Sequence, residues 1–235
     1  MPARYEVVAQ TYGAGPDDYT VPATSELLAL AGPIAGRRCL DLACGHGLIA
    51  RELARRGASS VVGVDLSESL LRRARGLESA APHGIDFFVA DATDPDLLPE
   101  RQFDVVTCNF GLSDIDDVPG LFTNVARLLD VGGCFVFSIL HPCFPGVDGV
   151  SPSWPSGGYH DERWWRADGE LSTLRQQVGA NHRTLSTYFN ALVASGLVVS
   201  RVLEPVSAEP LGYAQSMIGD VPLYLVVRAT GAAIT

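Results

Sequence analysis

The chain has 235 residues and a mass of 25.0 kDa, which fits one large domain or two small ones and excludes a multidomain assembly. Hydrophobic residues make up 47% of the chain and charged residues 19%, so the protein can bury a sizeable core and is neither disordered nor fibrous. The formal net charge of −10 argues against a nucleic-acid partner, because binding to phosphates needs a basic surface.

All 17 basic residues are arginine, and the chain contains no lysine. This excludes enzymes that need a Schiff-base lysine, a phosphate-loop lysine or a Tyr-Lys reductase pair. The same bias, with many alanines and glycines, is typical of a GC-rich bacterial genome and, by association, of secondary metabolism. The five cysteines form no C-x-x-C pair, so we expect reduced thiols in a cytoplasmic protein. The longest apolar runs are only strand-length, so we expect neither a signal peptide nor a membrane span.

Short apolar or β-branched runs alternate with amphipathic stretches through the first 140 residues, which is the pattern of an α/β fold. The runs are almost continuously apolar, as strands covered on both faces must be. We expect strands at 38–44, 60–66, 85–91, 103–109 and 133–140, and helices near 24–35, 47–57, 67–80 and 118–130.

The pattern changes after residue 141, where residues 142–181 are rich in Pro, Gly, Ser and Trp and predict an inserted cap. A helix at about 183–195 and strands at 197–204 and 222–229 complete the chain. The loop between these two strands is too short for a full crossover helix, so we expect the last strand to be antiparallel. The prediction is one domain with a seven-stranded sheet, divided into N-terminal lid helices (1–35), a core (36–141), the cap (142–181) and C-terminal elements (182–235).

A glycine-rich loop, DLACGHGLIA from Asp41 to Ala50, leaves the first strand and opens a helix. Glycines at such a place let the backbone approach a ligand closely at a helix N-terminus. Gly45-x-Gly47-x-x-Ala50, with Asp65 at the end of the second strand, also satisfies the dinucleotide fingerprint. The loop by itself therefore leaves an NAD-dependent oxidoreductase open.

Further acidic residues follow the same edge of the predicted sheet. Asp41 puts a carboxylate under the loop, where it repels a pyrophosphate and suits a cationic or amino-bearing ligand. Asp91 ends the third strand and Asn109 the fourth, and open α/β sheets bind ligands at these carboxyl ends. The alternatives are that Asp41 caps its own loop without touching a ligand, and that Asp65 and Asp91 cap turns or helices.

These segments resemble the class I S-adenosylmethionine-dependent methyltransferases, in particular their small-molecule, type 11 branch. The resemblance rests on CLDLACGHG, VVGVDLSESLL, FFVADATDPDLLP, FDVVTCNFGLSDIDD and LLDVGGCFVFSILHP. It covers about residues 36–142 and the HRTLSTYFNALVASGL helix, but not the cap. It implies a doubly wound, Rossmann-like sheet, S-adenosylmethionine as cofactor and S-adenosylhomocysteine as product.

The resemblance also implies roles for individual residues. Gly45 and Gly47 would pack under the methionine part of the cofactor, and Asp65 would accept both ribose hydroxyls. The remaining expected cofactor residues are Asp41 under the loop, Leu66 beside Asp65, Asp91 and the backbone of Ala92 at the adenine, Asn109 beside the sulfonium, and Tyr12 as a lid.

Methyl transfer needs alignment and desolvation, and a base only if the acceptor must lose a proton. His141, directly after the fifth strand, and His182, before the last helix, are the candidate bases, because imidazole titrates near neutral pH. The alternatives are that His141 shapes the pocket and that His182 packs locally. The acidic run 114–117 invites a magnesium site, but we interpret it as an exposed turn and expect no metal.

The cap carries aromatic residues that suit a flat or greasy acceptor, unless they form the insertion's own small core: Trp154, Tyr159, Trp164 and Trp165. We therefore expect methyl transfer to an oxygen or nitrogen of a small aromatic or glycosylated metabolite. The protein would act as a monomer or homodimer without nucleic acid or membrane. The alternatives are a relative that binds the cofactor without transferring methyl, cyclase-like or regulatory, and an NAD-dependent oxidoreductase, against which the Val-Ala-Asp91-Ala segment and the absent lysines argue.

Overall fold

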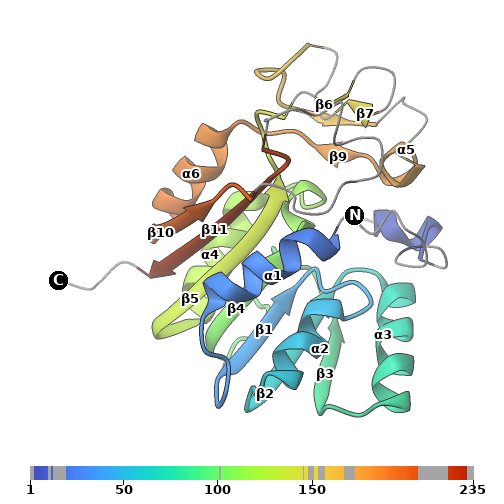
Figure 1. Ribbon diagram of the computed structural model, residues 1–235, viewed down its shortest axis with the longest axis vertical. Coiled ribbons are helices and arrows are strands. Elements are labelled where there is room, and N and C mark those ends of the chain that lie inside the picture. Colours follow the sequence, from blue (N-terminus) through green and yellow to red (C-terminus); the bar gives the residue numbers. More distant parts are fainter. Residues whose placement is uncertain are drawn as a thin grey trace.

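A seven-stranded sheet in the order β10-β11-β5-β4-β1-β2-β3 runs through the protein (Figure 1). The computed structural model describes residues 3–9, 12, 20–100, 102–144, 146–147, 151–152, 157–166, 173–205 and 222–231. The strands are β1 (Arg38–Leu42), β2 (Ser60–Asp65), β3 (Ile85–Val89), β4 (Phe103–Asn109), β5 (Leu129–Leu140), β10 (Leu197–Leu203) and β11 (Tyr224–Gly231).

Strands β1 to β5 are parallel to one another, whereas β11 is antiparallel to both β5 and β10. The predicted antiparallel last strand is confirmed. The structure adds that β11 enters the sheet between β5 and β10, so the last strand in the chain is not an edge strand.

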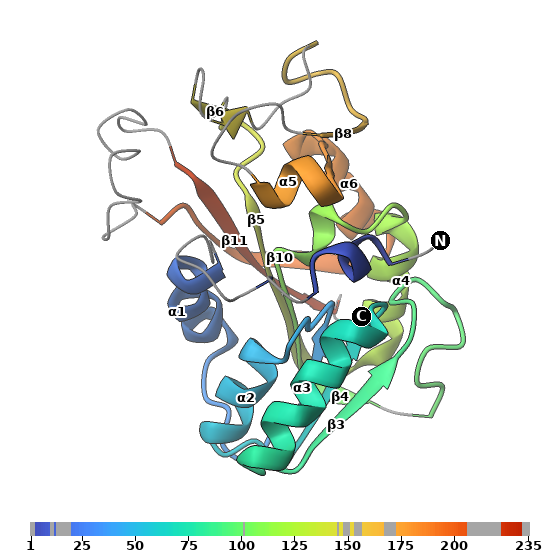
Figure 2. The same cartoon turned by 90° about the vertical axis from the view of Figure 1, so that its right-hand side faces the viewer.

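Helices cover both faces of the sheet, which confirms the doubly wound, Rossmann-like prediction (Figure 2). One face packs against α1 (Thr20–Ala31), α2 (Leu48–Arg55) and α3 (Glu68–Ala80). The other face packs against α4 (Val118–Leu128) and α6 (Leu185–Ala194). Side chains alternate along β1, so Leu40 and Leu42 pack on the face covered by α4 and α6. Cys39 packs on the opposite face, which α1, α2 and α3 cover.

Boundaries differ from the predicted ones where local signals compete with the sheet. The first long helix begins at Thr20 and ends at Ala31, ahead of Gly32, which has a φ of 78° and precedes a proline. Strand β5 begins at Leu129, four residues earlier than predicted, because Leu129 pairs with Phe103 before the ladder shifts register.

The cap lies above the carboxyl ends of the parallel strands (Figure 1). Its described parts form two small two-stranded sheets and a helix that the polar sequence did not predict. Trp154 lies outside the described residues. The cap elements are β6 (Gly146–Val147) with β7 (Ser151–Pro152), β8 (Trp164–Trp165) with β9 (Ala180–Asn181), and α5 (Thr173–Val178). Two short 3-10 helices, η1 (Arg4–Val7) and η2 (Gly111–Ser113), lie near the N-terminus and after β4.

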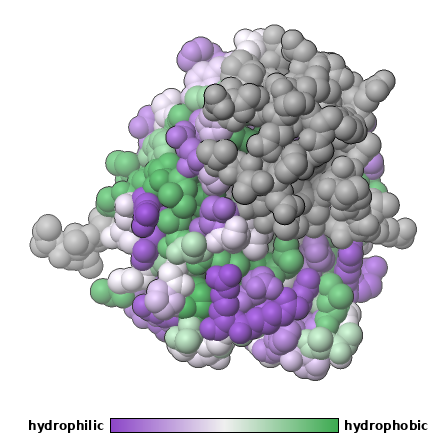
Figure 3. Space-filling model, viewed as in Figure 1, coloured by the Kyte–Doolittle hydropathy of each residue, from purple (hydrophilic) through white to green (hydrophobic). Residues whose placement is uncertain are grey.

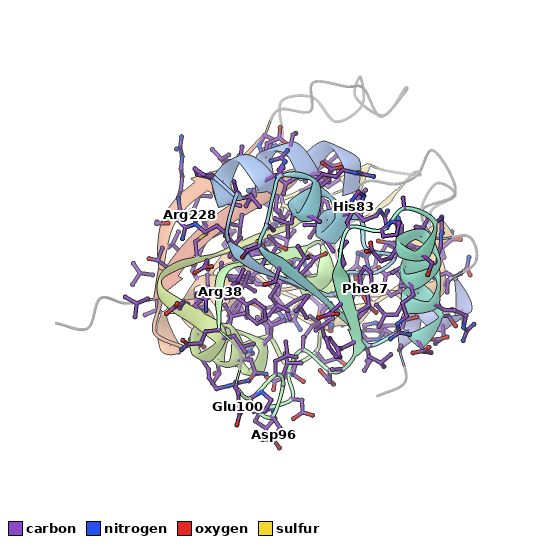
Figure 4. The ribbon with its side chains drawn as sticks, turned by 90° about the horizontal axis from the view of Figure 1, so that it is seen from below. Arg38, His83, Phe87, Asp96, Glu100 and Arg228 are labelled. Atoms are coloured by element: carbon purple, nitrogen blue, oxygen red, sulfur yellow. The ribbon has the colours of Figure 1, made fainter. Side chains whose placement is uncertain are left out.

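At the opposite end of the sheet, seen from below in Figure 4, Arg38 begins β1. Its guanidinium pairs with Asp104 at 2.8 Å and with Asp130 at 2.5 Å. Hydrogen bonding to Arg38 lowers the pKa of Asp104 to about 2. The charges at this end of the strands are therefore mutually compensated.

Hydrophobic side chains gather on the surface over α6 and β10 in Figure 3, where Val193, Val198 and Val202 are exposed. Among the described residues, no helix has the length and apolar character needed to cross a membrane.

Candidate functional site

The glycine-rich loop joins β1 to α2, and two of its glycines have left-handed backbone conformations, with φ of 56° at Gly45 and 82° at Gly47. A Cβ at Gly47 would lie 2.8 Å from a ring carbon of Phe87, which is labelled on β3 in Figure 4. Glycine at position 47 is therefore required by both the backbone and the packing of that ring.

Ala43 in the same loop also has a positive φ, 52°, which is uncommon for a residue with a side chain. The space for its methyl group comes from Gly111, because a Cβ there would lie 2.5 Å from the Ala43 Cβ. The loops after β1 and β4 thus touch each other. Nothing in the sequence pattern predicts this contact, which joins residues 68 positions apart.

Asp41 is 1% exposed and lies directly beneath the loop. Its Oδ1 accepts a hydrogen bond from the Thr107 hydroxyl at 2.9 Å, and its Oδ2 accepts one from the Ala50 N–H at 3.1 Å. These contacts fit the alternative in which Asp41 caps its own loop. Burial raises the pKa of Asp41 to about 7, so its carboxylate is costly to ionise in the structure as it stands.

Asp65 ties the glycine loop to the end of β2. Its Oδ2 accepts from the Gly45 N–H and its Oδ1 accepts from the Ser67 N–H, both at 2.8 Å. Burial raises the pKa of Asp65 above its usual value. Neither Asp41 nor Asp65 pairs with a cationic side chain within the described part of the chain. Leu66, next to Asp65, is 40% exposed at this edge.

Asp91 and Ala92 follow β3. The Asp91 Oδ1 accepts from the N–H and the hydroxyl of Thr93, at 2.9 and 2.7 Å, so the turn-capping alternative accounts for that oxygen. The Ala92 carbonyl accepts from the Asn124 side chain at 2.9 Å. These bonds hold the segment in place, and among the described residues none of them uses the Asp91 Oδ2.

Asn109 ends β4 and is held from the neighbouring strand. The Ser138 hydroxyl donates to the Asn109 side-chain carbonyl and accepts from the Phe110 N–H at 3.1 Å. Phe110 itself has a φ of 57°, and its ring packs edge-on against Tyr224, with the ring centroids 5.3 Å apart. Asn109 is thus oriented by a buried serine that the sequence gave no reason to select.

Tyr12 lies over the glycine loop. Its ring centroid is 5.7 Å from that of His46, and a Cβ on Gly45 would be 3.4 Å from a Tyr12 ring carbon. A hollow is lined by Tyr12, Asp41, Ala43, Cys44, His46, Leu48, Ile49 and Asn109. The structure therefore brings three of the predicted cofactor residues, from the N-terminal segment, β1 and β4, to one hollow.

The two histidines proposed as bases are buried, and their ring nitrogens contact protein groups. His141 Nδ1 accepts from the Cys143 N–H at 3.1 Å, so its proton is on Nε2, which lies 2.9 Å from a Glu204 carboxylate oxygen. His182 Nε2 donates to the Tyr159 carbonyl at 2.8 Å and so binds the cap to the segment before α6. Neither histidine lines the hollow beneath Tyr12.

Asp116 and Asp117 of the acidic run 114–117 are exposed, as the sequence predicted, whereas Asp114 is half-buried. Asp114 accepts from Tyr5 and pairs with Arg175, and Asp116 pairs with Arg4 at 2.7 Å. Asp117 caps α4 by accepting from the Gly120 N–H at 2.9 Å. The sequence pattern did not indicate the partners of Asp114 and Asp116, because these come from distant segments. Within the described residues, no group of three or more metal-binding side chains is present.

Comparison with known proteins places this geometry in a family. A protein-family model described as "Methyltransferase domain" matches residues 40–137. A ubiquinone biosynthesis O-methyltransferase from Thiobacillus denitrificans is 37% identical over 161 residues, covering 66% of this chain and 68% of that relative. The structure of an S-adenosylmethionine-dependent methyltransferase from Mesorhizobium loti shares 32% identity and a TM-score of 0.72, covering 92% of this chain and 99% of the other. A structure from Listeria monocytogenes shares 26% identity and a TM-score of 0.71, covering 90% and 98%.

Proposed function

The chain belongs to the S-adenosylmethionine-dependent methyltransferases, and from this premise we propose that it methylates an oxygen or nitrogen atom of a small, aromatic or glycosylated metabolite. Membership in this family sets aside the dinucleotide oxidoreductase that the glycine loop alone left open. The cofactor supplies the methyl group as an electrophile on a sulfonium sulfur.

The observation that carries the proposal is the set of polar groups around the glycine loop. Asp65 and Asp91 present carboxylate oxygens, which match the hydroxyl and amino donors of an adenosine. In our proposal Asp65 binds the ribose hydroxyls, Leu66 lies along the adenine, and Asp91 with the Ala92 N–H holds its amino edge.

The charge of the hollow supports the same assignment. Asp41 is buried and Asp65 is half-buried, and both lack cationic partners among the described residues, so a ligand with positive charge lowers the cost of ionising them. We propose that Gly45, Gly47 and Asp41 surround the methionine part of the cofactor. Tyr12 covers it, and Asn109, held by Ser138, lies beside the sulfonium.

The acceptor is proposed from the relatives and the cap. The relative from Thiobacillus denitrificans is named an O-methyltransferase of ubiquinone biosynthesis, which makes a phenolic or quinone-like acceptor the first class to test. In our proposal the cap, which carries Tyr159, Trp164 and Trp165, encloses the acceptor above the carboxyl ends of the parallel strands. The net charge of −10 argues against nucleic acid.

The wider context of the enzyme is also a proposal. We expect a monomer or homodimer in the cytoplasm, with a role in bacterial secondary metabolism. In the proposed division of the chain, residues 1–35 cover the cofactor, 36–141 bind it, 142–181 enclose the acceptor and 182–235 complete the sheet.

The histidine roles carry a geometric condition. His141 can receive an acceptor proton on Nδ1 only after the Cys143 N–H leaves that nitrogen, with Glu204 holding the Nε2 proton. His182 donates Nε2–H to the cap, so its proton-accepting nitrogen is Nδ1. If His141 is the base, His141→Ala lowers kcat far more than it raises KM. Equal changes in both constants would make it part of the pocket wall.

The proposed function is tested in two stages. Calorimetric titration with S-adenosylmethionine, S-adenosylhomocysteine and NAD should show binding of the first two at a stoichiometry of one and no binding of NAD. Catechols, phenols, amines and glycosylated phenols are then incubated with methyl-labelled cofactor. Label in a phenol or glycoside supports the acceptor class. Cofactor binding without label transfer to any class would favour the non-transferring alternative.

A further inference from the structure

The segment from η2 towards α4, residues 112–116, receives side chains from three distant segments. We call it the acidic loop. Partners reach it from η1 near the N-terminus, from the cap, and from Arg183 before α6, whose guanidinium donates to the carbonyls of Leu112, Ile115 and Asp116. Figure 2 shows η1 and α5 close to this loop, above the carboxyl ends of the strands.

The N-terminal partners are Arg4 and Tyr5. Arg4 forms a two-pronged hydrogen bond to the Asp116 carboxylate, at 2.7 and 2.8 Å, and donates to the Asp114 carbonyl at 2.9 Å. The Tyr5 hydroxyl donates to the Asp114 Oδ2 at 2.9 Å. Burial raises the pKa of Tyr5 well above its usual value, so the phenol stays protonated and remains a donor.

The cap partner of Asp114 is Arg175 of α5. Its guanidinium pairs with the Asp114 Oδ1 and also donates to the Gly179 carbonyl at 2.9 Å, which closes the end of α5. The two side chains are only 14% and 16% exposed. Asp114 thus gives one carboxylate oxygen to the N-terminal segment and the other to the cap. A pair this sheltered from water is costly to break from one side.

A chain of contacts continues from Asp114 to the cofactor hollow. The Tyr5 ring packs edge-on against Tyr12, with centroids 5.2 Å apart, and Tyr12 packs in the same way against His46. Tyr12 also lies over Gly45. Arg175 does not line the hollow, yet it is linked to the ring that covers it through Asp114 and Tyr5.

We propose that Asp114 is a positioning residue for methyl transfer. By holding Tyr5 and Arg175 on its two oxygens, it couples closure of Tyr12 over the cofactor to docking of the cap over the acceptor. The inference rests on the proposed function, in which the hollow beneath Tyr12 binds the cofactor. Its consequence is that cap residues remote from the cofactor control cofactor affinity.

The test measures S-adenosylhomocysteine affinity in Arg175→Met, Asp114→Asn and the double variant by calorimetry. Each single variant should bind about 10-fold more weakly than the unaltered protein. The affinity of the double variant should be no lower than that of the single variant with the lower affinity, because both changes break the same Asp114–Arg175 ion pair. The matched control is Arg163→Met, which removes an exposed cap arginine paired with Asp161 and should leave affinity unchanged.

A second readout does not depend on the cofactor. In the ligand-free protein, hydrogen exchange of the Val8 and Tyr12 amides, which donate to Tyr5 and Val8, should accelerate in Arg175→Met but not in Arg163→Met. Tyr5→Phe removes only the hydroxyl donor and provides the milder variant should Arg175→Met fail to fold.

The outcomes separate the two proposals. Unchanged affinity and unchanged exchange in folded Arg175→Met or Tyr5→Phe would overturn the coupling. Absence of S-adenosylhomocysteine binding to the unaltered protein would contradict the proposed function, while faster Tyr12 exchange in the variants would still support the linkage from cap to lid. A double variant with the product of the two single losses would show that Asp114 does not connect the segments.

Discussion

Aspartates lie near both ends of β1, but their pKa values are shifted in opposite directions. At the amino end, Arg38 pairs with Asp104 and Asp130, and the pKa of Asp104 falls to about 2. At the carboxyl end, Asp41 is buried among hydrogen-bond donors without a cation among the described residues, and its pKa rises to about 7. Charge is compensated within the protein at the amino end, and at the carboxyl end Asp41 has no cationic partner among the described residues.

The backbone shows the same contrast. Register along β1 is regular from Arg38 onward, pairing with β2 on one side and β4 on the other. Beyond Leu42 the chain turns through Ala43, Gly45 and Gly47, all with positive φ. Strain and uncompensated charge therefore gather at the carboxyl end, as expected where binding rather than folding stability has been favoured.

The largest expected effect comes from removing Asp65. Asp65→Ala should lower S-adenosylmethionine affinity by at least about 100-fold, since it removes a charge-assisted acceptor and frees the Gly45 N–H. Calorimetry measures the affinity, and circular dichroism checks the fold. Asp86→Ala, at an exposed acid on the next strand, is the control. Equal affinity in Asp65→Ala and the unaltered protein would refute the cofactor assignment.

The pH dependence of Asp41 comes next. Its folded pKa of about 7 lies above the ordinary value of 3.8, so the folded state binds the extra proton between these values. Stability from this residue is fully present below about pH 4 and is lost as pH rises through 7, by about 4 kcal/mol in total. Asp41→Asn should remove that loss and be the more stable protein at pH 8.

Urea unfolding at pH 5, 6, 7 and 8 measures this difference for both proteins in the absence of cofactor. Asparagine can still accept from the Ala50 N–H and donate to the Thr107 hydroxyl, so packing is preserved. Parallel stability profiles in the two proteins would show that Asp41 is ionised without penalty. The same variant should bind S-adenosylmethionine more weakly, since the charge opposite its cationic part is gone.

A steric change tests the strained loops at the carboxyl end. Gly111→Ala should destabilise the protein by about 1–3 kcal/mol, because the new methyl group meets the Ala43 Cβ at 2.5 Å and the Cys108 Sγ at 2.8 Å. Adding Ala43→Gly should restore part of the loss, leaving the contact with Cys108. Urea unfolding of the four proteins gives the coupling, and simple additivity would mean that the two loops do not touch.

The smallest effect is expected at the amino end. Asp104→Asn breaks an ion pair whose Arg38 side chain is 42% exposed, so the midpoint of thermal unfolding should fall by roughly 2 °C or less. The Asp104 pKa is depressed, so its contribution is present above about pH 4 and is lost as pH falls through 2. The variant should lose less stability on acidification and bind the cofactor normally. Weakened cofactor binding would contradict the separation of the two ends.

Prediction from the sequence succeeded where local pattern and chain order were enough. Alternating strands and helices place the ends of parallel strands at one edge, so Asp65, Asp91 and Asn109 could be assigned to that edge before any contact was known. It did not predict the partners of the acidic run, where Asp116 and Asp114 pair with Arg4 and Arg175 from segments more than 60 residues away. Long-range ion pairs leave no periodic trace along the chain.

The sequence by itself determined the α/β class, the antiparallel last strand and the position of the glycine loop, because apolar periodicity and glycine spacing act over a few residues. Tertiary structure decided which neighbours each polar group meets. In the folded protein, His141 forms hydrogen bonds with Glu204 and Cys143. Asp41 is buried without a cation among the described residues, and Asp114 connects the cap to the N-terminal segment. Electrostatic state depends on burial and on partners brought together by packing, and both exist only in the folded chain.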